Sequence, residues 1–385
     1  MPASSKHLKI TSKAPNDTRE GREIPSKRKP LDKDLFFTRD GDLFQVLTNV
    51  HPTDRVVALR KYHHITEQPR GMFFWQSPQR GGYFTRTIPT YDASNATQNI
   101  AKSNYSRVSQ VFGVPMIEVP WSEISAYLYP EQGLQDWLLN NKENEWGRAI
   151  TEIVTQFKDH LKIEEESMGI TGSLLWGGQH DASDIDVVVY GIKNTLRFIH
   201  NVPVLLRTSA SIHTPPPEFI ERSANTLAKK TGLQLDLTAQ YIAKKPYYLY
   251  YKKKFLSLGF VPLPGEISRK YEAYSFQTLA PIKVRAEILD DRWGYFYPSE
   301  YKISPRAIEI QGRGGKMPSR EEVARNLTTL LLMEREISGY YFPGDKIEVR
   351  GMLQAVREGP REYFQIMVGT HELFGNEWVR VLNEE

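Results

Sequence analysis

Two aspartates that lead into a strongly β-forming run constrain this chain more than any other feature of its sequence. Asp184 and Asp186 flank Ile185, and the run VVVY follows directly at 187–190. β-Branched and aromatic residues favour a strand, whose side chains alternate between two faces. The pattern therefore predicts a strand with one apolar face, while the other face begins with two carboxylates about 7 Å apart.

Two carboxylates this close repel each other unless a cation lies between them. Mg²⁺ prefers oxygen ligands and commonly binds one or two carboxylates together with the phosphate oxygens of a substrate. Small residues precede the aspartates at Gly172-Ser173 and at Gly177-Gly178. Such residues allow backbone N–H groups to approach a phosphate closely. The segment therefore predicts a site for a divalent cation and a phosphate-bearing ligand.

A third carboxylate would complete a site for two metal ions. The segment LQLDLTAQ at 233–240 alternates leucines with polar residues, a pattern that is typical of a strand with one apolar face. Asp236 lies on the polar face of this predicted strand. We therefore expect Asp236 on a strand of the same sheet as Asp184 and Asp186.

The order and spacing of these residues resemble the signature of the DNA polymerase β-like nucleotidyltransferase superfamily. Its pattern is Gly-Ser, a glycine, Ser-Asp-x-Asp on a strand and a third aspartate on a later strand. The matching residues here are Gly172, Ser173, Gly177, Ser183, Asp184, Asp186 and Asp236. The resemblance covers about 145–240, and the flanking regions more loosely resemble uncharacterised archaeal-type predicted nucleotidyltransferases.

The resemblance implies transfer of a nucleoside monophosphate from a nucleoside triphosphate, such as ATP, to a hydroxyl acceptor. Two Mg²⁺ ions, with Mn²⁺ as the alternative, would assist the reaction, and pyrophosphate would leave. Asp184 and Asp186 are implied to hold both ions and Asp236 the catalytic ion. The implied nucleotide-binding residues are Gly172, Ser173, Gly177 and Ser183.

The sequence departs from the superfamily pattern directly after the Gly-Ser pair. Many members carry arginine or another polar residue there, whereas this chain has Leu174, Leu175 and Trp176. This departure bears on the affinity for the triphosphate and leaves the metal-binding aspartates unaffected.

Lysines and tyrosines interleave at 238–255, after the predicted third aspartate. Lysines neutralise phosphates and tyrosines stack on bases, so the segment is a candidate contact for nucleic acid. An amphipathic segment with packed tyrosines and solvated lysines explains the pattern equally well. The candidate contacts are Lys244, Lys245, Lys252, Lys253 and Lys254.

Several acceptors and one competing class of protein are consistent with the sequence. The lysine-tyrosine segment favours a nucleic-acid acceptor, while a protein side chain and a small-molecule hydroxyl stay open. The competing class is a non-catalytic nucleic-acid-binding or regulatory protein that keeps the nucleotidyltransferase fold.

The net charge of +4 comes from the first 35 residues, which contain nine Lys or Arg and five Asp or Glu. The rest of the chain is balanced. Because 1–32 is rich in Ser, Pro and Lys and lacks apolar periodicity, we predict a flexible basic tail. Affinity for nucleic acid would therefore need local basic patches.

We expect an α+β protein with three domains after the tail. An N-terminal α+β domain at 33–140 opens with a hairpin at Asp40-Gly41. The polymerase β-like domain, a mixed sheet with helices, spans 141–280. A β-rich domain at 281–385 contains three final strands and is a candidate for a small barrel of the kind that binds oligonucleotides.

Two helices are predicted with particular clarity. Apolar residues recur at helical spacing through 144–164. A capping box formed by Ser319 and Glu322 opens a second helix, which the pattern extends to Ile337, with Gly339 after its end.

Composition excludes several classes of protein. The chain has no cysteine, which rules out disulfide scaffolds, thiolate zinc sites and cysteine nucleophiles. No run approaches the roughly 18 apolar residues of a membrane span, and the N-terminus lacks a secretory signal. The expectation is a soluble, cytoplasmic protein without a membrane partner.

Overall fold

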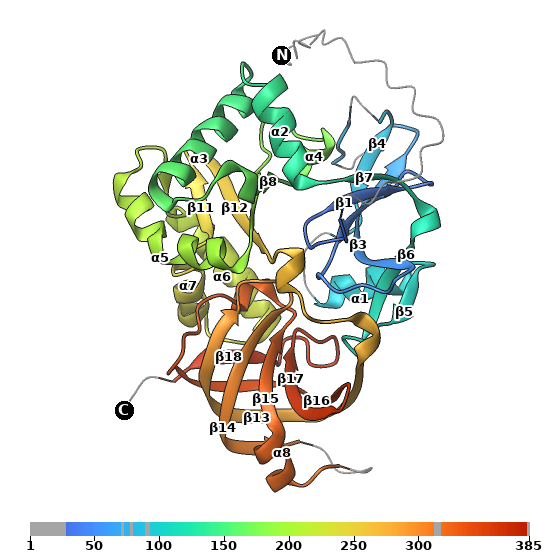
Figure 1. Cartoon of the computed structure of the whole chain (residues 1–385), viewed down its shortest axis with the longest axis vertical. Coiled ribbons are helices and arrows are strands. Elements are labelled where there is room, and N and C mark those ends of the chain that lie inside the picture. Colours follow the sequence, from blue (N-terminus) through green and yellow to red (C-terminus); the bar gives the residue numbers. More distant parts are fainter. Residues whose placement is uncertain (1–27, 71–72, 78–79, 89–92, 312–316, 383–385) are drawn as a thin grey trace.

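The computed structural model describes residues 28–70, 73–77, 80–88, 93–311 and 317–382, which form three β-sheets with helices packed against them (Figure 1). The predicted mixed α+β architecture is confirmed. Most of the predicted flexible tail lies outside the described residues. Its end, at 28–32, is packed rather than free: Leu31 is buried, and Arg28 forms an ion pair of 2.7 Å with Asp34.

The N-terminal sheet begins with the predicted hairpin. β1 (Leu35–Thr38) and β2 (Leu43–Val46) pair antiparallel, and Gly41 in the turn has a φ of 84°, which glycine adopts without steric cost. The strand order is β5-β6-β3-β2-β1-β7, with β4 paired to β3. The other elements are β3 (Arg55–Ile65), β4 (Tyr83–Arg86), α1 (Ala93–Ala101), β5 (Ser106–Val108), β6 (Pro115–Pro120) and β7 (Ile124–Leu128).

The central sheet has the order β10-β11-β12-β9-β8, and its core is built against two long helices. The predicted amphipathic helix is confirmed, and the side chain of Asn144 caps it by accepting a hydrogen bond from the Gly147 N–H at 2.8 Å. The elements are α2 (Pro130–Asn140), α3 (Glu145–Leu161), β8 (Met168–Ile170), α4 (Ser173–Trp176), β9 (Ile185–Tyr190), α5 (Ile192–Thr208), β10 (Ile212–His213), β11 (Tyr248–Tyr251) and β12 (Lys254–Val261).

The last helix of the predicted N-terminal domain belongs to the central core. Leu134, Trp137 and Leu138 of α2 pack in the same cluster as Ile150 of α3 and Ile170 of β8. The Nε1 atom of Trp137 also donates to the Leu174 carbonyl at 3.0 Å. The N-terminal sheet itself therefore ends with β7.

The alternation predicted for β9 is present. Ile185, Val187 and Val189 lie in the core with α3 and α5. Since neighbouring side chains of a strand point to opposite faces, Asp186 lies on the other side of the sheet. On that opposite face, Val188 and Tyr190 pack in a second cluster with Leu31 and Val261, so Asp186 at the start of the strand is left to line a site.

The segment 233–240 is not a strand, and this prediction is wrong. It lies in α7 (Leu235–Ala243), which packs on α6 (Pro217–Thr231). Thr238, Tyr241 and Ile242 are buried, which is helical spacing, and the Thr238 hydroxyl donates to the Ala224 carbonyl at 3.1 Å. The alternation of leucines covered too few residues to distinguish a strand from a short helix. The buried residues of this helix come mostly after the leucines.

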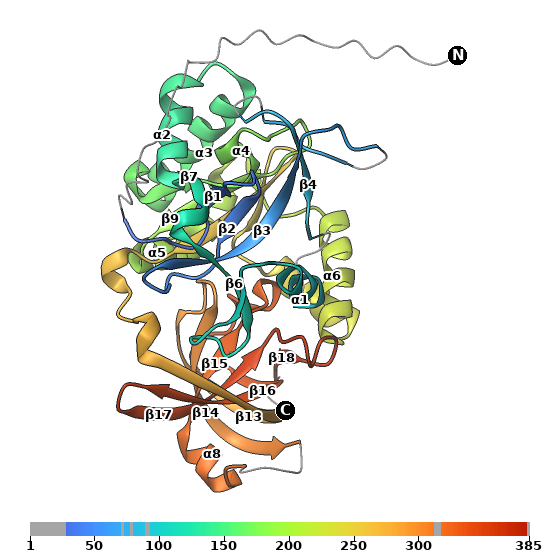
Figure 2. The same ribbon diagram turned by 90° about the vertical axis from the view of Figure 1, so that its right-hand side faces the viewer.

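The C-terminal sheet closes on itself as a barrel. Its strand order is β13-β14-β15-β17-β16, and β16 pairs with β13 to complete the ring, while β18 pairs with the other edge of β16 (Figures 1 and 2). β15 and β17 are parallel. The elements are β13 (Tyr274–Trp293), β14 (Ser299–Ile310), α8 (Arg320–Asn326), β15 (Leu327–Leu332), β16 (Lys346–Glu358), β17 (Arg361–Val368) and β18 (Trp378–Val381).

The helix predicted after Ser319 begins as expected but ends early. The Ser319 hydroxyl accepts a hydrogen bond from the Glu322 N–H at 3.1 Å, and α8 stops at Asn326. The residues LTTLLL at 327–332 form β15 instead. Leu330 and Leu332 fill the barrel core from this strand, so tertiary pairing overrides the helical pattern.

Within the described residues, no helix is both long enough and apolar enough to cross a membrane.

Candidate functional site

The two aspartates of the motif lie together at the start of β9. Asp184 is exposed and Asp186 is half-buried. Gly172, in the loop after β8, packs directly against them: a Cβ atom added to it would lie 2.1 Å from Oδ2 of Asp186. Its φ of 65° and ψ of −148° belong to a region that only glycine adopts readily. This glycine is therefore required for the loop to approach the carboxylate.

The pKa of Asp184 is raised to about 6. The larger cause is partial desolvation, because the exposed carboxylate sits in a concave surface; the second cause is the charge of Asp186. Arg86, Arg222 and Lys254 oppose the shift from a distance. A divalent cation between the carboxylates would remove the repulsion.

Cation binding at this pair is expected to depend on pH. Since a bound proton competes with the cation, affinity for Mn²⁺ should rise as the pH rises through about 6. Without a cation, the raised pKa of Asp184 makes the folded state bind more protons than the unfolded state. The free energy of unfolding should therefore fall as the pH rises from about 4 to about 6. Titration calorimetry and denaturation across this range measure both trends, and Asp184→Asn should flatten both.

The predicted third carboxylate does not join Asp184 and Asp186. Asp236 is exposed in the first turn of α7, and within the described residues no group of three or more His, Cys, Asp or Glu side chains comes together to hold a metal ion. The prediction of a site with three aspartates is therefore wrong. On β12, the parallel neighbour of β9, Ser257 occupies the register position of Asp186 and donates its hydroxyl to Oδ1 of Asp186.

Three of the four predicted nucleotide-binding residues line a small cavity of about 210 Å³ beside the aspartates. The Ser183 hydroxyl accepts a hydrogen bond from the His180 N–H at 2.9 Å, so it also fixes the loop. Gly177 instead ends α4 with a φ of 75°. Polar residues that line this cavity are Lys61, Arg86, Ser173, His180, Ser183, Asp184 and Asp186.

The apolar residues after the Gly-Ser pair have a packing role. Trp176 is buried among side chains of the N-terminal sheet, including Phe37 and Phe84. Leu174 packs in the central core. Leu174 and Trp176 thus join the central unit to the N-terminal sheet.

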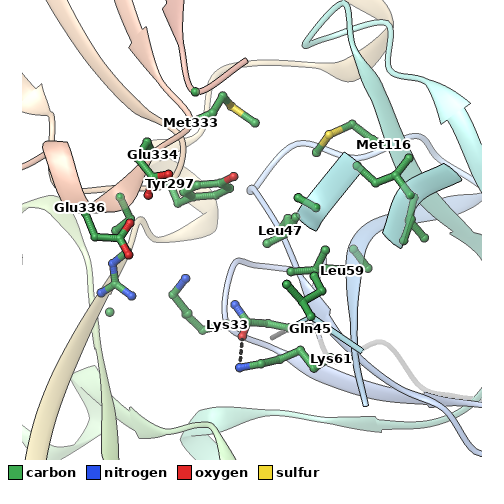
Figure 3. Close-up of a pocket in the computed structure, with 18 of the residues that line it drawn as sticks. Lys33, Gln45, Leu47, Leu59, Lys61, Met116, Tyr297, Met333, Glu334 and Glu336 are labelled. Carbon is green, nitrogen blue, oxygen red and sulfur yellow. Dashed lines mark hydrogen bonds between the residues drawn. The ribbon is translucent and has the colours of Figure 1, made fainter. Parts of the chain in front are cut away.

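A larger cavity of about 610 Å³ also has Asp186 in its lining, and its other lining residues come from all three sheets (Figure 3). Gly172, Asp186 and Lys61 line both cavities. Lys61 donates to the Gln45 side chain at 3.0 Å. In Figure 3, Leu47, Leu59 and Met116 lie across the cavity from Glu334 and Glu336.

Charged side chains line the other part of the larger cavity. Lys33 is buried, which lowers its pKa, although an ion pair of 2.8 Å with Asp32 opposes the shift. Glu334 and Glu336 share Lys230 at 3.4 and 3.0 Å. Burial and the charge of Glu336 raise the pKa of Glu334. The cavity thus combines cationic, anionic and apolar regions.

The structure does not gather the lysines of 244–254 into one groove. Lys245 is buried and donates to the Arg335 carbonyl at 2.6 Å, so it is not available to a nucleic acid. Lys254 donates to the Asp181 carbonyl at 2.8 Å, and Lys252 pairs with Glu152 at 3.4 Å. Lys244 and Lys253 are exposed.

Several site residues carry no local sequence signal. Lys33, Lys61 and Arg86 come from the N-terminal segment, where neither spacing nor composition marks them. Ser257 is the single polar side chain among residues 255–261 of β12, a pattern that could have drawn attention to it once β12 was predicted. The fold alone brings these residues to the aspartates.

The fold and site define a mixed α+β protein with an acidic pair, of which Asp186 lines two cavities. No protein-family model matches the chain, and no solved structure matches it significantly. The uncharacterized protein MJ1086 of Methanocaldococcus jannaschii is 24% identical over 218 residues, which are 56% of this chain and 59% of that protein. The chain thus spans less than two thirds of that relative.

Proposed function

We propose that this protein is a nucleotidyltransferase of the polymerase β-like type. The observation that carries the proposal is the acidic pair at the start of β9, in which Asp186 packs against Gly172 and lines both cavities. A transfer reaction between two substrates needs such a junction, because donor and acceptor must meet at the same group. The smaller cavity would take the triphosphate and the larger one the acceptor.

The residues present fit one divalent cation. Asp184 and Asp186 are oxygen ligands of the kind that Mg²⁺ and Mn²⁺ prefer, and their repulsion favours a bound cation. When bound, the cation would polarise the transferred phosphoryl group. A second ion would need its remaining ligands from the substrates, since no third carboxylate joins the pair among the described residues.

Other side chains would bind and orient the substrates. Lys61 and Arg86 would balance the negative charge of the phosphates in the smaller cavity. Ser257 would hold the Asp186 carboxylate in one orientation through its hydrogen bond. The volume of the larger cavity, about 610 Å³, suits one nucleoside or a molecule of similar size. The acceptor hydroxyl could thus belong to the end of a nucleic acid or to a small molecule.

The second candidate function is a non-catalytic protein that binds a nucleotide or nucleic acid with the same fold. Ser257 favours it, because the strand beside the acidic pair presents a hydroxyl where a third carboxylate would complete a two-metal site. Such a protein would bind a triphosphate without transferring any part of it.

Incubation with each labelled nucleoside triphosphate, Mg²⁺ or Mn²⁺, and RNA, DNA, protein or small-molecule acceptors distinguishes the two candidates. Transfer of label with release of pyrophosphate supports the enzyme. Cation-dependent triphosphate binding without transfer supports the second candidate. If neither binding nor transfer is detected, both proposals are wrong.

Replacing Ser257 by aspartate is expected to strengthen the site. The new carboxylate would lie beside Asp186 and supply the missing ligand, so Mn²⁺ affinity should rise by about tenfold or more. Without a cation, the added repulsion should lower the melting temperature. Calorimetry and thermal denaturation with and without Mn²⁺ test this, with Ser257→Asn as the uncharged control. An unchanged Mn²⁺ affinity would show that Ser257 does not face the cation.

A further inference from the structure

The outer face of the barrel carries a group of cations around one tryptophan. Along β13, β16 and β18, the apolar side chains Ile282, Val284, Val349 and Val379 fill the barrel core. The alternate positions therefore face outward. We call these outward residues the basic strip: Lys283, Arg285, Glu348, Arg350, Trp378 and Arg380. The three strands run side by side in the lower part of Figure 2.

The strand register brings these side chains into two adjacent rows. Lys283 lies opposite Arg350, which lies opposite Trp378. In the next row, Arg285 lies opposite Glu348, which lies opposite Arg380. Since paired strands are about 4.8 Å apart, four cationic side chains share a small area.

Glu348 holds the cations in place. It is only 1% exposed and accepts hydrogen bonds from Arg285 at 3.2 Å and from Arg380, while Lys283 lies 3.3 Å away. Burial alone would raise its pKa, but these cations hold the pKa below its usual value. One ionised carboxylate thus contacts three cations, and Arg350 is a fourth cation of the strip, so an excess of positive charge remains.

Among the described residues, neighbouring acids reduce this excess but do not remove it. Glu287 pairs with Arg306 at 2.7 Å, and Glu309 lies opposite Lys283 on β14. Because the chain beyond residue 35 has no net charge, the strip is a local concentration of positive charge.

Two observations indicate the chemistry of a ligand for this strip. The side chains of Arg285 and Arg380 are 62% and 43% exposed, so their guanidinium groups can donate to a phosphate oxygen while each also contacts Glu348. The Arg380 guanidinium lies 4.9 Å from the centre of the half-exposed Trp378 ring. A guanidinium beside an aromatic ring suits stacking on a nucleobase.

We infer that the basic strip binds single-stranded nucleic acid, with phosphates on its cations and a base on Trp378. A single strand presents phosphates and unstacked bases together, whereas an anionic membrane or an acidic peptide presents only negative charge. This binding needs neither a nucleotide nor a divalent cation, so it is independent of the proposed transfer.

Fluorescence anisotropy of the full chain with a labelled oligouridylate, in EDTA, tests the inference. The logarithm of the association constant should fall with the logarithm of salt concentration, with a slope of about −2 to −3 for three or four phosphates. Trp378→Ala should weaken binding about tenfold, and Trp378→Phe should restore much of it. Arg350→Gln should reduce the slope by about 0.7.

Matched control variants test whether the basic strip is the binding surface. Lys244→Gln with Lys253→Gln removes two exposed lysines elsewhere and should leave binding unchanged. Circular dichroism confirms that each variant is folded. The inference is wrong if no oligonucleotide binds at low salt or if the lysine control abolishes binding. It is equally wrong if Trp378→Ala has no effect, or if anionic vesicles compete fully.

Discussion

Replacement of both Asp184 and Asp186 by asparagine is expected to abolish nucleotidyl transfer. The double variant keeps the shape of both side chains and removes the two charges that would hold the cation. We expect the rate of transfer to fall by about a thousandfold or more, on the order of the loss of a preorganised electrostatic group. Label transfer with the best donor and acceptor measures this loss.

The stability of the same variant separates the site from the fold. Because the two carboxylates repel each other, their neutralisation should preserve or raise the melting temperature without cation. Asp181→Asn, at an exposed aspartate three residues earlier, and Asp236→Asn, on α7, are matched controls. Both should retain full activity. A loss in Asp236→Asn as large as in the double variant would contradict the two-aspartate site.

Gly172→Ala is expected to damage the site and the fold together. The added Cβ would overlap Oδ2 of Asp186, and the backbone conformation of Gly172 excludes other residues. We expect a loss of about 1–3 kcal/mol in the free energy of unfolding, and a larger relative loss of Mn²⁺ affinity because the carboxylate must move. Denaturant titration and calorimetry measure the two effects.

Gly265→Ala is the matched control for this substitution. Gly265 is exposed, has no atom within 4 Å of an added Cβ, and needs no positive φ. The control should therefore unfold at the same denaturant concentration as the parent chain. If Gly172→Ala behaves like the control, the loop does not press against Asp186 as the structure describes.

Local patterns predicted the elements whose signals are long or chemically specific. At the hairpin, the turn residues Asp40-Gly41 agree with the strand-forming residues on either side. In α3, the cap at Asn144 agrees with the helical periodicity that follows it. The alternation around Ile185 placed the apolar face of β9 in the core. Each of these patterns depends on interactions between residues close together in the chain, so it does not require knowledge of distant partners.

Predictions failed where distant partners decide the outcome. The leucines before Asp236 fit a strand, but packing on α6 makes the segment helical. The apolar run at 327–332 fits a helix, but pairing with β14 and β17 makes it β15. For the same reason Lys61 and Ser257 could not be assigned to the site in advance, since only the assembled sheets bring them beside Asp186.

The larger cavity has a consequence for how the three sheets behave as a whole. Its wall includes Gln45 from the first sheet, Asp186 from the second and Met333 at the end of β15 in the third. A molecule that fills it would contact all three units at once, and its binding energy would oppose their separation. A bound molecule would thus stabilise the packing of the three units reversibly. The central unit on its own would contain the aspartates but only a fraction of the cavity wall.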